Sequence, residues 1–267
     1  MTFYKPPENL LLELGITEPE EIDIEAIAFY TGATVVYRNL DGCAARIVGK
    51  RDKAVISVDP STNKGRQRFS IGHEVGHWMR DRGKTVVSCQ QQDFRRPWGY
   101  EYRKDPESLA NEYSSDLLLP EFMFRPAAQN RPMTFDTVNS LAERFLTSRT
   151  ATAIRLIQYG SFPAMLVCHS RNKRKWYTRG DDIPDYLHPH RTLNPETNAF
   201  ALLYGAEERF NRPLTVDAYT WINYSSSEGY KIQEHSIKVA DDEVLTMLWW
   251  KDEKQLIELM ERRNGFY

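Results

Sequence analysis

The sequence predicts an α+β protein. Of its 267 residues, 41% are hydrophobic and 27% are charged, which is typical of a chain that buries a sizeable core. Along the chain the spacing of apolar residues switches between the helical period and short β-branched runs. Prolines and glycines stand where these patterns change. We therefore expect three parts, at residues 1–133, 134–160 and 161–267.

The N-terminal part begins with two short helical patterns, at residues 7–15 and 21–31, and Gly32 can end the second one. Three short β-branched runs follow, at 33–40, 44–50 and 53–59. The dipeptides Asp41-Gly42 and Arg51-Asp52 separate them and are typical of turns. These runs predict a small antiparallel sheet of about three strands.

Two longer helices are predicted next, at residues 64–80 and 106–119. Pro106 suits the first turn of the second helix, and Pro120 ends it. The polar segment 84–104 between the helices predicts a loop. The proline-containing segment 120–133 predicts irregular structure.

Residues 134–160 predict two short helices joined by a turn near 146–148. Strand-like runs then follow at 164–170, 175–180, 217–224, 230–240 and 244–252, and a helical pattern closes the chain at 253–263. The region 161–267 therefore predicts a mixed α/β domain, which we interpret as sensor-like or substrate-docking. Its sequence does not indicate a ligand.

The charge and the cysteines narrow the class of protein. With 35 basic and 37 acidic residues the net charge is −2, so nothing indicates a chain-wide binder of polyanions. The three cysteines lie far apart, which does not indicate a disulfide framework. Neither a signal peptide nor a membrane-spanning run is recognisable. We expect a soluble cytoplasmic protein without a membrane partner.

The first long helix contains the pattern His-Glu-x-x-His. His73 and His77 are four residues apart, so both imidazoles face one side of the helix and can bind the same cation. Glu74 is offset by one residue and can act on a water molecule without being a ligand itself. This arrangement is typical of hydrolysis assisted by Zn²⁺, with the glutamate as general base.

A chance match to this pattern is the alternative explanation. Such a match should occur in about one per cent of chains of this length. Gly72 and Gly76 lie beside the histidines, although glycine lowers helix stability by about 1 kcal/mol at each position. Two glycines here indicate the close approach of another backbone or of a substrate. We therefore favour the metal site over a chance match.

A catalytic zinc usually has a third protein ligand. The second long helix offers Glu107, Glu112 and Asp116. At about 100° per residue, Glu107 and Asn111 lie on one shoulder of the apolar stripe of this helix, while Glu112 points away from it. Glu107 is therefore the favoured ligand, and Asn111 can fix the orientation of a ligating histidine. Glu112 together with Asp116 remains the alternative.

The two helix patterns together resemble the ImmA/IrrE family of metallopeptidases. The similar segments are RQRFSIGHEVGHW at 66–78 and ESLANEYSSDLLLP at 107–120, and the resemblance covers roughly residues 7–160. Tyr113, Ser114 and Leu119 replace the phenylalanine, alanine and methionine that are commoner in the family. These are mild departures at packing positions.

The resemblance implies a zincin-like metallopeptidase core in residues 1–133. It implies His73, His77 and Glu107 as zinc ligands and Glu74 as general base. Members of the family are typically intracellular, and several cleave a DNA-binding repressor of the helix-turn-helix type. The resemblance thus implies a protein substrate, with a repressor from a stress-response, mobile-element or toxin–antitoxin system as the expected one.

A different class of function stays open. The segment 140–156 resembles a helix-turn-helix, so the chain could be a non-catalytic metal-binding regulator that binds a partner or DNA. Direct DNA binding is not favoured, because Arg144, Arg149 and Arg155 are few and a packed helical pair explains the same pattern. Tyr100, Tyr102 and Arg103 are candidates for stabilising an oxyanion, with ordinary loop packing as the alternative.

Overall fold

The computed structural model describes residues 4–81, 87–88, 105–205 and 212–261. It confirms the α+β class. By compactness the chain divides into two units, Met1–Ala127 with Ser140–Thr152, and Ala128–Asn139 with Ala153–Tyr267. We refer to them as the N-terminal and C-terminal units. This division crosses the helical segment 134–160, and the three-part division at residues 133 and 160 stays a prediction.

The N-terminal unit begins with α1 (Pro7–Glu13), the 3₁₀ turn η1 (Pro19–Glu21) and α2 (Ile24–Tyr30). Helix α2 is capped at its start by Asp23, whose carboxylate accepts hydrogen bonds from the backbone N–H groups of Glu25 and Ala26. Helix α2 ends where the sequence predicted, because Gly32 just beyond it has a φ of 90°. The chain then turns directly into the sheet.

The N-terminal sheet is mixed, and the expectation of a purely antiparallel sheet was wrong. Within the described residues it contains β1 (Ala33–Tyr37), β2 (Ala45–Lys50), β3 (Lys53–Val58) and β4 (Val87–Ser88). Their order is β1-β3-β2-β4. Strand β1 pairs with β3 in parallel, whereas β2 pairs with β3 and with β4 antiparallel.

Burial explains this order. Strand β3 has buried side chains at Ala54, Ile56, Ser57 and Val58, so it occupies a central position with a partner on each side. The turn at Arg51, whose φ is 59°, joins β2 and β3 as a hairpin. The segment with Asp41-Gly42 does not join neighbouring strands, because β1 lies on the far side of β3. Parallel pairing leaves no turn signature in the sequence.

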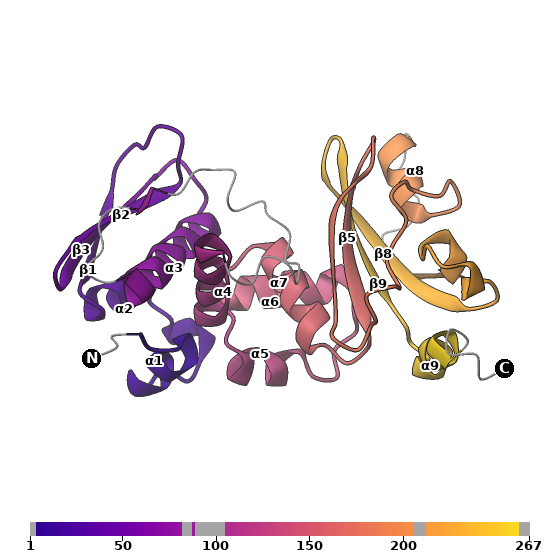
Figure 1. Ribbon diagram of the computed structural model, residues 1–267, viewed down its shortest axis with the longest axis horizontal. Helices are drawn as coiled ribbons and strands as arrows, with labels where there is room; N and C mark the ends of the chain where they lie inside the picture. The colour runs from indigo at the N-terminus through magenta and orange to yellow at the C-terminus, as the bar shows by residue number, and fades with distance from the viewer. Residues whose placement is uncertain (1–3, 82–86, 89–104, 206–211, 262–267) are drawn as a thin grey trace. The chain divides into compact units, whose positions relative to one another are not determined.

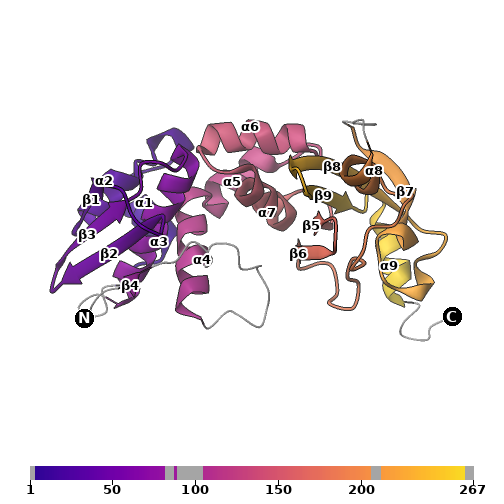
Figure 2. The same cartoon turned by 90° about the horizontal axis from the view of Figure 1, so that it is seen from above.

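Helix α3 (Lys64–Asp81) lies on one face of this sheet, and α4 (Pro106–Leu118) packs along α3 (Figures 1 and 2). Gly72 and Gly76 explain the close packing. A Cβ atom at Gly72 would lie 2.6 Å from Ser114 Oγ, and one at Gly76 would lie 3.0 Å from Tyr113 Cβ. The expected close approach of another backbone is thus confirmed.

The helices α5 (Glu121–Ala128), α6 (Phe135–Phe145) and α7 (Arg149–Tyr159) follow. The two short helices at 134–160 were expected, with their turn at 146–148. Helix α5 was not, because Pro126 inside it and the neighbouring prolines indicated irregular structure. No helix among the described residues is long and apolar enough to cross a bilayer.

The C-terminal unit is built on an antiparallel sheet of five strands within the described residues, in the order β6-β5-β9-β8-β7. The strands are β5 (Ala164–Ser170), β6 (Arg174–Arg179), β7 (Leu214–Asp217), β8 (Lys231–Ala240) and β9 (Glu243–Trp249). The remaining elements are α8 (Asn198–Tyr204), the 3₁₀ turns η4 (Ala218–Thr220) and η5 (Ser225–Ser227), and α9 (Glu253–Glu261). The strand expected at 217–224 was wrong, because this segment turns into η4 where Trp221 enters the core.

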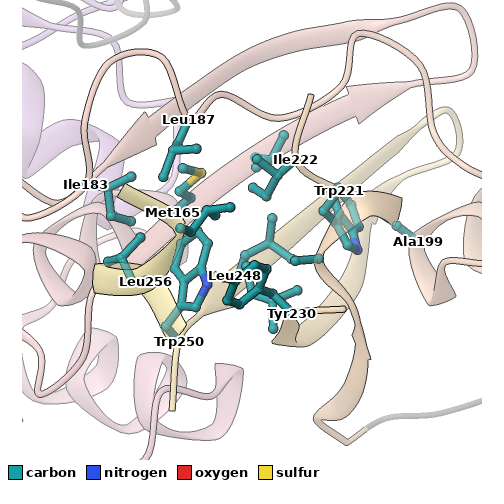
Figure 3. Close-up of a cluster of buried hydrophobic side chains, with 14 of the residues drawn as sticks. Met165, Ile183, Leu187, Ala199, Trp221, Ile222, Tyr230, Leu248, Trp250 and Leu256 are labelled. Carbon is teal, nitrogen blue, oxygen red and sulfur yellow. The ribbon is translucent and has the colours of Figure 1, made fainter. Parts of the chain in front are cut away.

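The hydrophobic core of this unit lies on one face of its sheet. Met165 and Leu248 from the strands pack there with Trp221, Ile222 and Trp250 (Figure 3). On the other face, the ring of Phe135 lies 5.2 Å from that of His235, centroid to centroid. Both faces are therefore covered by apolar side chains, which explains the almost continuous burial of β5 and β9.

Candidate metal centre

The structure brings together three side chains that the sequence singled out. His73 and His77 project from α3, and Glu107 projects from the first turn of α4. One ligand atom from each lies within 4.8 Å of the others. His73 Nε2 is 3.2 Å from Glu107 Oε2, His77 Nε2 is 3.2 Å from Glu107 Oε1, and the two Nε2 atoms are 3.0 Å apart.

These distances suit a single small cation. Nitrogen and oxygen ligands lie about 2.0–2.1 Å from zinc, so neighbouring ligands of a tetrahedral ion are about 3.4 Å apart. The observed separations of 3.0–3.2 Å are close to that value. Two imidazoles and one carboxylate also match the ligand types that zinc prefers in catalytic sites. The donor set therefore fits Zn²⁺ and leaves a fourth position for water or substrate.

Burial and charge keep the ligands in their metal-binding protonation states. His73 is fully buried, and this burial lowers its pKa below the usual value. Burial alone would raise the pKa of Glu107, but its close contacts with the imidazoles of His73 and His77 outweigh the effect of burial and lower the pKa. The carboxylate is thus ionised while His73 is neutral at pH 7.

Asn111 determines which nitrogen of His73 faces the centre. His73 Nδ1 lies 2.9 Å from Asn111 Oδ1, one turn beyond Glu107 on α4. Because an amide oxygen is an acceptor, Nδ1 carries the hydrogen atom and donates a hydrogen bond to Asn111. The Nε2 atom of a neutral His73 then has its lone pair directed at Glu107 and His77. Lone pairs that face each other in this way repel, and a cation bound between them removes this repulsion.

Glu74 follows His73 on α3 and is fully buried, so it is not a solvated carboxylate on a helix face. The alternative ligand pair behaves differently. Glu112 is exposed and Asp116 is half-buried, and neither belongs to the cluster of potential ligands found among the described residues. The geometry thus separates Glu107 from the two other carboxylates of α4.

The other candidate groups do not assemble into a site. Arg155 is 4% exposed and lies over the ring of Tyr159 at 5.3 Å, and Arg144 pairs with Glu18 and Glu20. Two of the three arginines considered for DNA are therefore engaged within the protein. Tyr100, Tyr102 and Arg103 lie outside the described residues.

Two contacts that position α3 were not foreseen. Ser114 Oγ donates a hydrogen bond to the carbonyl of Phe69 at 2.8 Å, which ties α4 to α3 one turn before the histidines. Trp78 Nε1 donates to the carbonyl of Thr31 at 2.8 Å and its ring covers Gly49 on β2. The sequence signals for these contacts are weak, since a serine and a small residue at packing positions have many explanations.

Comparisons with known proteins add two findings. A search among curated proteins found no match to the chain. Among solved structures, a Mycobacterium tuberculosis transcriptional regulator has a similar fold, with a TM-score of 0.57 and 16% sequence identity. The similarity covers 95% of this chain and 77% of that one. At this identity the likeness concerns the fold alone.

The family comparison is more specific. Residues 28–156 match the model of the M78 peptidases, described as the IrrE N-terminal-like domain. The matched segment includes α3, α4 and the cluster of His73, His77 and Glu107. The domain at residues 28–156 therefore belongs to the M78 peptidase family, the family of IrrE-like proteins.

Proposed function

We propose that this protein is a zinc-dependent endopeptidase that hydrolyses a peptide bond in a protein substrate. The observation that carries the proposal is the convergence of His73, His77 and Glu107, with ligand atoms 3.0–3.2 Å apart. Membership of a peptidase family supports the class of reaction. Zinc in this position would lower the pKa of a water molecule and polarise the carbonyl group that is attacked.

The residues of the chain have separate roles in this proposal. His73, His77 and Glu107 hold the ion, and Asn111 keeps the ring of His73 in the binding tautomer. Glu74 accepts the proton of the attacking water and passes it to the leaving nitrogen of the peptide. The carboxylate of Glu74 is offset by about 100° from His73 around α3, so it can act beside the ion without coordinating it.

We further propose a DNA-binding repressor of the helix-turn-helix type as the substrate, on the basis of the family resemblance. The competing proposal is a non-catalytic metal-binding regulator that binds a partner or DNA. It requires no general base, whereas Glu74 is retained and buried beside the cluster. Arg144 and Arg155, which would have to contact phosphates, are engaged with other side chains.

The decisive experiment separates metal binding from catalysis. The purified protein is incubated with purified helix-turn-helix repressors of the same organism, and cleavage and zinc content are both measured. We expect Glu74→Gln to retain one zinc per chain and to lose cleavage by a factor of about 10² or more. His77→Ala should lose both zinc and cleavage. Undiminished cleavage by a zinc-loaded Glu74→Gln variant would rule out the proposed mechanism.

A further inference from the structure

The N-terminal sheet has a face that the helices leave open. Helix α3 contacts β1, β2 and β3 from one side, and α2 and α4 pack against α3 on that same side (Figure 1). Side chains alternate between the two faces of a strand, so every second residue points to the opposite side. The open sheet face consists of Thr34, Val36, Arg46, Val48, Lys50, Lys53 and Val55, and the buried Ser57 lies between Arg46 and Val36.

Aliphatic side chains occupy the middle of this face. Val48 lies directly opposite Val55, and Val55 lies opposite Thr34 across the sheet. Val48 is 46% exposed and Val55 is 42% exposed, while Val36 on β1 is 36% exposed. Single exposed valines are ordinary, but Val48 and Val55 are neighbours in one row and Val36 lies in the adjoining row, so the three form a small apolar strip.

Cations border the strip on both sides. Lys50 lies directly opposite Lys53 in the next row, and Arg46 lies in the row beyond the valines. Like charges in directly opposed positions destabilise a sheet. The strands β1, β2 and β3 contain no acidic residue, and Asp52 and Asp59 lie just outside them. In the part of the chain that the structure describes, none of these cations forms an ion pair.

The size of the open sheet face limits the size of a partner that can bind to it. Strands lie about 4.8 Å apart and rise about 3.3 Å per residue, so three strands of five to six residues present roughly 15 by 20 Å. This is about a third of the 800 Å² that each partner contributes to a standard interface. A short segment therefore fits the face better than the surface of a whole domain.

We propose that the open sheet face docks a short acidic segment of a protein partner. Aliphatic side chains of the segment would cover Val48 and Val55, and its carboxylates would neutralise Lys50 and Lys53. The face has no aromatic residue on which a nucleic-acid base could stack, which favours a protein over a single-stranded nucleic acid. The proposal does not depend on the metal centre, which lies on the other side of the sheet.

Fluorescence anisotropy with a defined probe tests this surface. The probe is a labelled peptide of about twelve residues that alternates glutamate with leucine or valine, added to the full chain at about 50 and about 200 mM salt. We expect binding that weakens at the higher salt and falls at least tenfold in the K50E/K53E variant. A matched control, K251E/K254E, changes the charge equally at exposed lysines of the C-terminal unit and should bind like the wild type.

Two further measurements complete the test. V48T/V55T should weaken peptide binding without changing its salt dependence, because it removes apolar contact and leaves the cations in place. Urea unfolding verifies that each variant is folded. The proposal fails if the acidic peptide does not bind at millimolar concentration, if K50E/K53E binds it normally, or if a lysine–leucine peptide binds equally well. It also fails if a labelled single-stranded oligonucleotide binds more tightly and depends on Lys50 and Lys53.

Discussion

Each unit of this protein contains a carboxylate with several close polar neighbours, and the two carboxylates have opposite surroundings. Glu107 in the N-terminal unit faces the imidazole nitrogens of His73 and His77 at 3.2 Å. Glu234 on β8 in the C-terminal unit is fully buried and accepts at least three hydrogen bonds. The donors include Ala199 N at 2.8 Å, Ser236 Oγ at 2.8 Å and Trp221 Nε1 at 3.0 Å.

Glu107 is half-buried whereas Glu234 is fully buried, but the main difference lies in the groups that surround each carboxylate. Around Glu234 the described partners are donors, so the carboxylate completes the start of α8 and holds Trp221 on the sheet. Around Glu107 the imidazole nitrogens of His73 and His77 are bases, which can share a cation with the carboxylate. A buried carboxylate is therefore a candidate functional group when its neighbours are other acceptors, and a structural group when they are donors.

Exchanging each carboxylate for leucine should produce opposite results, and this is the largest expected effect. Glu234→Leu leaves three buried donors unpaired, so we expect a loss of about 3–5 kcal/mol in the free energy of unfolding with zinc affinity unchanged. Glu107→Leu should lower zinc affinity roughly a thousandfold or more, because even residues that only support a ligand contribute 10- to 100-fold. Urea unfolding of the metal-free protein and zinc titration measure the two quantities.

The control is Glu234→Gln, which keeps an acceptor oxygen for part of the donor set and should lose less stability than Glu234→Leu. If Glu107→Leu destabilised the metal-free protein as much as Glu234→Leu, the carboxylate of Glu107 would be structural. The comparison between the two units would then be wrong.

His169 in the C-terminal unit allows the effect of burial on a titratable group to be measured through the pH dependence of stability. It is 1% exposed on β5, and burial lowers its pKa from 6.5 to about 4. The unfolded chain therefore binds a proton between pH 6.5 and 4 that the folded chain does not. The stability associated with neutral His169 is complete above pH 6.5 and is lost as the pH falls to 4, by about 3 kcal/mol in total.

Thermal and urea unfolding between pH 7.5 and 4 can detect this loss when the wild type is compared with His169→Gln. Glutamine preserves a donor to the carbonyl of His190, which His169 Nε2 contacts at 3.2 Å, but it does not titrate. The difference in stability between the two proteins should change across this pH range by the stated amount. Parallel pH profiles would show that His169 does not sense pH through burial.

The sequence was sufficient to predict that His73, His77 and Glu107 lie together, because all three are on helices. The spacing of His73 and His77 places them on one side of α3, and the apolar stripe of α4 orients Glu107 toward the core. The same reasoning separated Glu107 from Glu112. Geometry could be inferred here because a helix converts sequence distance into direction.

Pairing between strands was less predictable, since it depends on contacts between residues far apart in the sequence. Nothing in residues 33–40 indicates that β1 pairs with β3 in parallel. Likewise, Glu234 in the run KIQEHS gave no sign of its role, because its donors come from α8 and from Trp221, thirty-five and thirteen residues earlier. A buried carboxylate in a strand is recognised only when its partners are known.

Substitution of Asn111 has the smallest expected effect on zinc affinity. It tests whether the surroundings of Glu107 and His73 are arranged for a metal ion. Asn111 Oδ1 accepts a hydrogen bond from His73 Nδ1 at 2.9 Å. This contact directs the lone pair of His73 Nε2 toward the candidate metal centre. Asn111→Ala removes this constraint but none of the three ligand atoms, so we expect zinc affinity to fall 10- to 100-fold. Asn111→Asp, which also accepts from Nδ1, should retain most of the affinity, and a metal titration of both variants distinguishes orientation from bulk packing. Equal losses in the two variants, accompanied by equal losses in stability, would mean that Asn111 supports the packing of α4 rather than the tautomer of His73.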